Sequence, residues 1–226
     1  MDAVTVWRIG LDPGGRAEEL RSHLAPDELE RLERLRRSEV GPRWLVSRAA
    51  MREILAAELG VSPASVRLRL GPHGRPQLGL EHHPTDLDFN LSHSGQLALL
   101  ATARGVRVGV DVERLRRRDP LRVADRYFSA AELEALRAHP HGDRPRAFLR
   151  YWTAKEALAK GLGLGLTVPW GELELAQQPA GVMVPVRQAK DWRLVELDDL
   201  PDGYCGALAV DDADARIEVR DWPPAS

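Results

Sequence analysis

The sequence predicts an α+β protein made of two closely packed lobes. Segments with the alternation of strands and segments with the periodicity of helices occur in both halves of the chain. Its 226 residues suffice for one sizeable core or for two small lobes that share a core. No stretch rich in Pro, Gly and Ser separates the halves, and residues 103–105 are the best candidate for a boundary. We therefore expect an N-terminal lobe over residues 1–104 and a C-terminal lobe over residues 105–226.

The N-terminal half is expected to form a strand, two helices and a strand-turn-strand unit. Residues 4–11 (VTVWRIGL) have the pattern of a strand. Residues 26–37 form a helix that starts at Pro26, and Gly41-Pro42 separates it from a second helix over residues 43–59. Further strands are expected at residues 65–70, 87–91 and 96–103, with SHSG at 92–95 as the turn between the last two.

The C-terminal half is expected to start with the strand GVRVGVDVE at residues 105–113. Helical periodicity predicts helices over residues 133–139 and 146–162, and the GLGLGL sequence that follows is typical of a helix end. That run lacks the GxxxxGK spacing of a phosphate loop. The last strands are expected at residues 192–197, 204–210 and 217–219.

Composition and charge limit the partners of the chain. The formal net charge is -2, so the whole molecule does not attract nucleic acid or membranes, and any anion site must be built locally. Cys205 is the single cysteine, which excludes an internal disulfide and is compatible with a reducing compartment. The first residues lack the pattern of a signal peptide, and no apolar run reaches the roughly 20 residues that span a bilayer. We therefore expect a cytoplasmic protein.

Two acidic side chains fall on one face of the strand at residues 105–113. Because side chains alternate along a strand, Asp111 and Glu113 point the same way, with Cα atoms about 6.6 Å apart. Neighbouring Gly109 leaves room for another group to approach the backbone. Two interpretations stay open: an acidic edge screened by solvent, or a site for a divalent cation such as Mg²⁺, which prefers oxygen ligands.

Lysine is rare in this chain, and two of its three lysines lie in the sequence WTAKEALAK at residues 152–160. On a helical wheel Lys155 falls inside an apolar stripe, whereas Glu156 and Lys160 lie together on its flank. The simpler interpretation is a surface pair of Glu156 with Lys160, and a Lys155 ammonium that reaches solvent along an apolar face. The alternative is that both lysines bind phosphate, because an ammonium is a compact donor on a flexible stem.

The FNLSHSG sequence at residues 89–95 places Ser92 and His93 in a predicted turn between two strands. The backbone N–H groups of a turn, a hydroxyl and an imidazole can together bind an anion. A satisfied surface histidine is the simpler explanation. The chain has no His-x-x-x-His pair and no Gly-x-Ser-x-Gly sequence, which disfavours zinc proteases and serine hydrolases.

Four short motifs follow one another along the chain: GRP at 74–76, FNLSHSG at 89–95, GVDVE at 109–113 and WTAKEALAK at 152–160. In order and spacing this series resembles the 4'-phosphopantetheinyl transferases of the Sfp type. The family pattern runs G-K-P, F-N-x-S-H-S, G-hydrophobic-D-hydrophobic-E and W-x-x-K-E-x-x-x-K. The resemblance extends from Pro26 to Val210, and GYCGALAV at 203–210 matches the family's last core strand.

The resemblance implies two similar α/β lobes related by a pseudo-twofold, with coenzyme A in the cleft between them. It implies an enzyme that moves the phosphopantetheine arm of coenzyme A onto a serine of an apo carrier protein (acyl, peptidyl or aryl) and releases adenosine 3',5'-bisphosphate. Such carriers serve fatty acid, polyketide or nonribosomal peptide biosynthesis. We expect an acidic carrier that docks on the basic loop RLRRRDPLR at 114–122 and on the segment beyond Lys160, and an enzyme that is a monomer.

The resemblance also assigns roles to individual residues. Asp111, Glu113 and Glu156 match the family's Mg²⁺ ligands, with Mn²⁺ as an alternative, and Glu156 also matches the general base. Lys160 matches the lysine that steadies the phosphate and the leaving group, and Lys155 is expected to help it. The residues expected to bind coenzyme A are Arg31, Arg43, Arg48, Arg75, Ser92, His93, Asp111, Lys155 and Lys160.

Two departures from the family pattern concern phosphate binding. Arg75 replaces the lysine of the G-K-P motif, and arginine can still bind phosphate bidentately. In the N-terminal helix Arg31 matches one of two basic residues that meet the 3'-phosphate, but Glu28 occupies the position of the other. Arg43 and Arg48 are candidates to compensate. Tolerance of dephospho-coenzyme A is a hypothesis that follows from Glu28.

Two other functions compete with the transferase. A non-catalytic module that binds coenzyme A or a carrier protein needs the same anion pocket but no base. A nucleic-acid binder could use the basic runs RLERLRR at 31–37 and RLRRRD at 114–119. Acidic residues interrupt the first run, the second is very short, and no aromatic stacking platform accompanies either.

Overall fold

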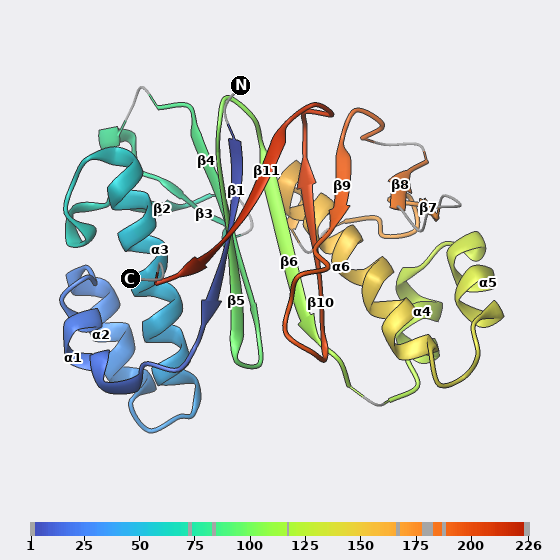
Figure 1. The fold of residues 1–226 in the computed structure, drawn as a ribbon, viewed down its shortest axis with the longest axis horizontal. Coiled ribbons are helices and arrows are strands. Elements are labelled where there is room, and N and C mark those ends of the chain that lie inside the picture. Colours follow the sequence, from blue (N-terminus) through green and yellow to red (C-terminus); the bar gives the residue numbers. More distant parts are fainter. Residues whose placement is uncertain are drawn as a thin grey trace.

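Two layers of helices enclose two β-sheets that pack face to face (Figure 1). The computed structural model describes residues 3–71, 74–82, 85–116, 118–165, 168–177, 183–186 and 189–223. Each sheet buries one face against its helices and the other against the second sheet, so the amphipathic elements dictate the layering. The α+β class is therefore confirmed. Within the described ranges, no helix has the length and apolar character needed to cross a bilayer.

The first lobe contains a four-stranded sheet in the order β11-β1-β5-β4. Its strands are β1 (Ala3–Gly10), β4 (Leu87–Ser94), β5 (Leu97–Arg104) and β11 (Arg216–Trp222). The long helix α3 (Val40–Leu59) covers one face, and α1 (Ala17–Arg21) and α2 (Pro26–Leu35) lie beside it (Figure 1). Leu55 of α3 belongs there to the same core as Ile9 and Leu100 of the sheet.

The second lobe contains a three-stranded sheet in the order β6-β10-β9, made of β6 (Val108–Arg114), β9 (Arg193–Glu196) and β10 (Tyr204–Val210). Helix α6 (Arg144–Leu162) covers its outer face, and α4 (Leu121–Tyr127) and α5 (Ala130–Ala138) lie beyond it (Figure 1). Two small sheets pair β2 (Leu68–Leu70) with β3 (Pro76–Leu78), and β7 (Leu175–Gln177) with β8 (Met183–Pro185). Single 3₁₀ turns lie at Gly14–Arg16, Pro63–Ser65 and Leu80–His82.

The two lobes share one connectivity. In chain order, β1, α3, β4 and β5 form a strand, a long helix and a hairpin whose last strand lies next to the first strand. The elements β6, α6, β9 and β10 repeat this order. A third core between the sheets joins the lobes, with Val6 and Leu99 from one side and Val110 and Leu208 from the other. Two similar lobes are thus present, as the resemblance implies.

The last strand, β11, returns to the first lobe. It pairs in parallel with β1, so Ala3 lies opposite Arg216 and Ile9 opposite Trp222. The predicted boundary at residues 104–105 falls in the turn between β5 and β6. However, residues 216–222 belong to the first sheet, although the predicted division assigns them to the second lobe. The two lobes are therefore not consecutive pieces of chain.

The bounds of α2, α6 and β10 agree with the predicted elements within two residues. Helix α3 starts before the expected interruption at Gly41-Pro42, because proline is tolerated in the first turn of a helix. Ser92 and His93 correct another expectation: they lie in strand β4, opposite Leu99 and Ala98. The chain turns later, at Gly95, whose φ of 60° suits glycine.

Candidate active site at the junction of the two lobes

Strands β4 and β6 meet at the junction through side chains. Three alternating polar side chains of β4 accept hydrogen bonds from β6 N–H groups: Asp88 from Val108 at 2.9 Å, Asn90 from Val110 at 2.9 Å and Ser94 from Arg114 at 3.1 Å. Each pair is 20 positions apart, so the strands run in the same direction. These side chains set the register of the two lobes. Sequence reasoning missed this role, although the alternating polar positions of DFNLSHS carry the signal.

The remaining polar position of β4, Ser92, lies at a charged cluster between the lobes. Its hydroxyl donates to Asp111 Oδ1 at 2.7 Å and accepts from Lys160 Nζ at 3.0 Å. The Lys160 ammonium also donates to Asp111 Oδ1 at 2.6 Å. Asp111 is buried, and its other oxygen, Oδ2, has no hydrogen-bond partner among the described residues.

Glu113 and Glu156 form the rest of the acidic side of the cluster. Both are half-buried, and Glu113 accepts a hydrogen bond from Ser94 Oγ at 2.6 Å. The pKa of Glu156 is raised, first by burial and then by the charges of Asp111 and Glu113, while Lys160 opposes the shift. The three carboxylates therefore lie close enough to act on one another electrostatically.

The acidic cluster fits a divalent cation by donor chemistry but not by its present arrangement. Carboxylate oxygens are the ligands that Mg²⁺ prefers, and the buried Asp111 Oδ2 atom lacks a partner that a cation could supply. In the described part of the chain, however, no three His, Cys, Asp or Glu side chains are grouped closely enough to hold a metal ion. The Lys160 ammonium occupies the cation position at Asp111 Oδ1. The role of these acids as metal ligands stays a prediction.

Close packing of α6 on β6 brings Glu156 and Lys160 to the cluster. A Cβ atom at Gly109 would overlap the Ala157 carbonyl oxygen and the backbone N of Gly161, so glycine is needed for this approach. The group for which Gly109 leaves room is therefore helix α6 itself.

Arg75 holds three elements together beside the cluster. Its guanidinium donates to both Asp88 oxygens at 3.0 and 3.1 Å. It also donates to the carbonyls of Phe89, Val108 and Lys160 at 2.8, 3.0 and 2.6 Å. A cavity of about 380 Å³ lies next to it, lined among others by Asn90, Glu156 and Lys160. Arg75 thus has a structural role, and its contact with phosphate stays a prediction.

The expectation for Lys155 is corrected. Its ammonium is fully buried, so it neither reaches solvent nor joins the cluster of Asp111 and Lys160. It donates to both oxygens of Glu132 at 2.8 and 2.7 Å and to the Leu173 carbonyl at 2.8 Å. These three bonds use all three ammonium donors, so none remains for coenzyme A. Burial lowers the pKa of Lys155, and the charge of Glu132 opposes this shift.

A second cavity, of about 320 Å³, opens beside Glu113. Arg43, Trp44 and His93 contribute to its lining. His93 is exposed and Arg43 is half-buried, so both can meet an anionic ligand in this cavity. The structure thus places His93 and Arg43 together in a cavity beside the acidic cluster. Ser92, the neighbour of His93, instead contacts Asp111 within the cluster.

The basic residues of α2 and α3 divide into two groups. Arg48 Nε lies 2.6 Å from Glu28 Oε1, and Arg52 binds the other oxygen of the same buried carboxylate. Two guanidinium groups therefore share one carboxylate, which leaves this trio with a net positive charge, and the compensation by Arg48 stays a prediction. Arg31 is exposed, and its guanidinium lies 5.4 Å from the centre of the Trp44 ring. Its contact with a 3'-phosphate stays a prediction.

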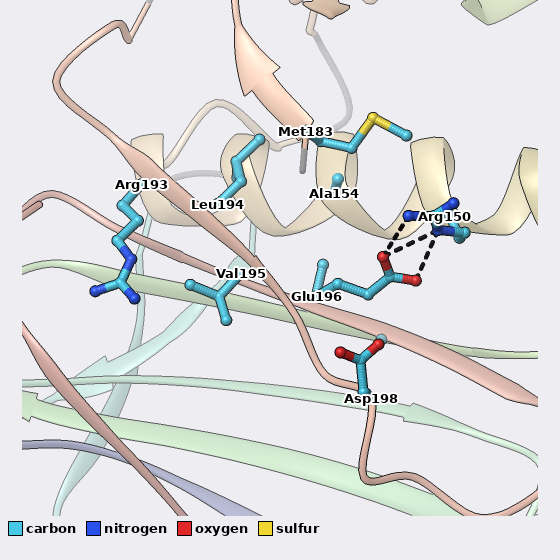
Figure 2. Close-up of a pocket in the computed structure, with 10 residues that line it drawn as sticks. Arg150, Ala154, Met183, Arg193, Leu194, Val195, Glu196 and Asp198 are labelled. Atoms are coloured by element: carbon cyan, nitrogen blue, oxygen red, sulfur yellow. Dashed lines mark hydrogen bonds and ion pairs between the residues drawn. The ribbon is translucent and has the colours of Figure 1, made fainter. Parts of the chain in front are cut away.

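A further cavity, of about 450 Å³, lies on the other side of α6 (Figure 2). Figure 2 shows Arg150 of α6 bound to Glu196 of β9 at its rim, with Met183 and Leu194 nearby. None of the three acids of the cluster lines this cavity. It is therefore separate from the site between the lobes.

Between two similar lobes, three carboxylates and one ammonium come together, groups that can accept a proton, hold a cation and neutralise negative charge. The family described as "4'-phosphopantetheinyl transferase superfamily" matches residues 107–209, and "4'-phosphopantetheinyl transferase, N-terminal" matches residues 16–105. The 4'-phosphopantetheinyl transferase HetI of Nostoc sp. is 38% identical over 92% of this chain and 88% of its own length. The chain belongs to the 4'-phosphopantetheinyl transferase superfamily.

Two further proteins show lower similarity to this chain. The 4'-phosphopantetheinyl transferase Sfp of Bacillus subtilis is 26% identical over 67% of this chain and 66% of its own length. The crystal structure of Thermotoga maritima holo-[acyl-carrier-protein] synthase is 24% identical over 46% of this chain and 61% of that chain. Its TM-score is 0.38.

Proposed function

We propose that this enzyme transfers the 4'-phosphopantetheine of coenzyme A to a serine of an apo carrier protein. In this reaction the serine oxygen forms a bond to the phosphorus that bears pantetheine. The bond from that phosphorus to the bridging oxygen breaks, and adenosine 3',5'-bisphosphate leaves. Family membership supports this activity, and the convergence of Asp111, Glu156 and Lys160 between the lobes is the observation that carries it.

Glu156 is proposed as the general base. A base works best when its pKa lies near the working pH, and burial together with Asp111 raises the pKa of Glu156 toward that range. The carboxylate would accept the serine proton directly or through water. Lys160 is proposed to hold the pyrophosphate and to neutralise the charge that gathers on the leaving group. The Lys160 side chain is 28% exposed and lines the neighbouring cavity, so its ammonium can turn from Asp111 toward a ligand there.

Asp111, Glu113 and Glu156 would hold Mg²⁺ or Mn²⁺, which when bound neutralises and aligns the phosphates of the donor. Asp111 Oδ2, which has no hydrogen-bond partner among the described residues, and the mutual repulsion of the acids support this proposal. Loading the site requires the Lys160 ammonium to leave Asp111 Oδ1.

The carrier protein is proposed to dock beside Glu113. A groove there combines Arg116 and Arg118 with apolar Phe148 and Trp152 of α6. An acidic helix with an apolar face complements such a surface. Arg117 of the same basic run lies outside the described residues. Arg116 also lines the cavity with His93, whereas Arg118 lines the groove alone, so Arg118 is the cleaner probe.

Arg118→Glu should therefore raise the KM for the carrier and leave the KM for coenzyme A unchanged. Equal increases in both constants would contradict the docking site. Asp119→Lys, which removes a negative charge from the same groove, is the opposite-sign control.

The transfer itself is tested by the intact mass of purified apo carriers incubated with enzyme, coenzyme A and Mg²⁺. A gain of one phosphopantetheine unit is expected with at least one of an acyl, a peptidyl and an aryl carrier, and the panel identifies the class served. Glu156→Gln should abolish the gain but retain binding of coenzyme A in the presence of metal. Full transfer by Glu156→Gln would show that Glu156 is not the general base.

The competing functions of the sequence analysis are weaker. The relatives are named as transferases, which disfavours a non-catalytic binding module. Residues 31–35 of the basic run at 31–37 lie on α2, where Arg34 and Glu33 are both exposed, as in a solvated helix face. Cytoplasmic location and a monomeric state stay predictions; a buried Cys205 in β10 is compatible with a reducing compartment.

A further inference from the structure

The buried ion pair of Glu132 and Lys155 joins three separate segments of the second lobe. Glu132 Oε1 accepts from Lys155 and from the backbone N–H of Leu175, which begins β7. Glu132 Oε2 accepts from Lys155 and from the N–H of Ser129, the N-cap of α5. Lys155 closes the network by donating to the Leu173 carbonyl. Both side chains are completely buried, and every donor of the ammonium is used.

Such a network is a poor source of stability but a strong constraint on geometry. Taking two charges out of water costs much of what their attraction returns, so hydrophobic residues of similar volume often replace a buried pair without loss. What the pair does fix is the rotation of α6, because the ammonium must meet Glu132 and Leu173 together. The Phe128 ring, 5.5 Å from the ammonium, closes the remaining side.

Lys155 and Glu156 are consecutive on α6, so their side chains diverge by about 100° around the helix. Rotation of the helix that frees Lys155 therefore swings Glu156 by the same angle. At the side-chain radius of about 5.5 Å, a rotation of about 10° displaces a carboxylate by ~1 Å. A displacement of ~1 Å at a reacting group can reduce the rate about 100-fold.

We propose that the buried Glu132–Lys155 pair is a positioning device that sets the direction of the Glu156 carboxylate toward Asp111. The inference rests on the proposed role of Glu156. Lys155 touches neither phosphate nor carrier in this assignment; it acts through its neighbour. This role also explains why residue 155 is a lysine. Three acceptor oxygens converge on its buried ammonium, a geometry that suits a compact ammonium and not the flat guanidinium of arginine.

The test is the double variant Glu132→Gln with Lys155→Met, which removes both charges and roughly keeps their volume. We expect a folded protein whose kcat falls by ~10-fold or more, while the KM for coenzyme A stays within about twofold. Affinity for Mn²⁺ without coenzyme A should also fall, because Glu156 no longer faces Asp111. A folded double variant with wild-type kcat and Mn²⁺ affinity would overturn the inference and leave the pair purely structural.

The matched control is Arg150→Met with Glu196→Gln. This pair, drawn in Figure 2, also anchors α6, but its side chains are 24% and 34% exposed. Removal of this pair should leave kcat unchanged. If kcat fell as much as it does on removal of the buried pair, any anchor of α6 would have the same effect, and the inference would be overturned. Should the double variant not fold, Glu132→Gln alone keeps the size but replaces one acceptor oxygen by an NH₂ donor, which breaks part of the network, and it must lower kcat. Absence of transfer by the unmodified enzyme would instead reject the proposed function.

Discussion

Replacing Lys160 by methionine should make the enzyme bind a divalent cation more tightly when coenzyme A is absent. In the structure the Lys160 ammonium lies 2.6 Å from Asp111 Oδ1, and the Asp111 side chain is only 5% exposed. A cation that enters must first displace this ammonium. A hydrogen bond between charged groups contributes about 1.5–3 kcal/mol, and about 1.4 kcal/mol corresponds to a tenfold change in affinity. The dissociation constant for Mn²⁺ should therefore fall by ~10–100-fold.

The measurement is titration of Mn²⁺ by calorimetry or by electron paramagnetic resonance, with and without coenzyme A. Lys190→Met removes an exposed lysine from the loop before β9 and is the matched control, with no expected change. Turnover of Lys160→Met should fall at the same time, because the ammonium is no longer available to the pyrophosphate. Equal or weaker Mn²⁺ binding by Lys160→Met would refute the idea that lysine and metal compete for Asp111.

Three further predictions concern charge, packing and the lobe junction. The raised pKa of Glu156 means that a proton competes with the cation as pH falls, so Mn²⁺ should bind more weakly at about pH 5.5 than at about pH 7.5, and Glu156→Gln should flatten this dependence. Gly109→Ala should cost about 1–3 kcal/mol through overlap with α6 and lower the melting temperature by ~2–12 °C, whereas Gly10→Ala, with open space around it, should cost little in the same thermal melt. Asn90→Leu leaves the Val110 N–H buried without its acceptor, so a loss of about 1–3 kcal/mol is expected in urea unfolding; wild-type stability would show that Asn90 does not tie the lobes together.

The periodicity of the sequence was sufficient to predict which side chains share one face of a strand or helix, because the local backbone decides this. Alternation along β6 puts Asp111 and Glu113 on the face that meets α6, and the helical wheel separates Lys155 from Glu156 and Lys160. Neither pattern predicts which residue a side chain will contact in the folded protein. A wheel places Lys155 in an apolar stripe, but the decisive acceptor, Glu132, lies 23 positions away on another helix.

Long-range pairing was the part that the sequence did not reveal. Strand β11 joins β1 across nearly the whole chain, and Arg48 pairs with Glu28 of another helix. The position of the β4–β5 turn depends on Gly95, whose positive φ moves the turn past Ser92 and His93. Such outcomes follow from tertiary contacts that a single sequence does not display.

The return of β11 makes the first lobe dependent on residues that are synthesised after the second lobe. Until they leave the ribosome, β1 is an unprotected sheet edge beside a finished second lobe, and apolar Val4 and Val6 lie on that edge strand. The first sheet is therefore completed only when β11 pairs with β1, after the second lobe has been made. Cutting the gene between the lobes would yield two fragments, neither of which holds a complete sheet of the first lobe.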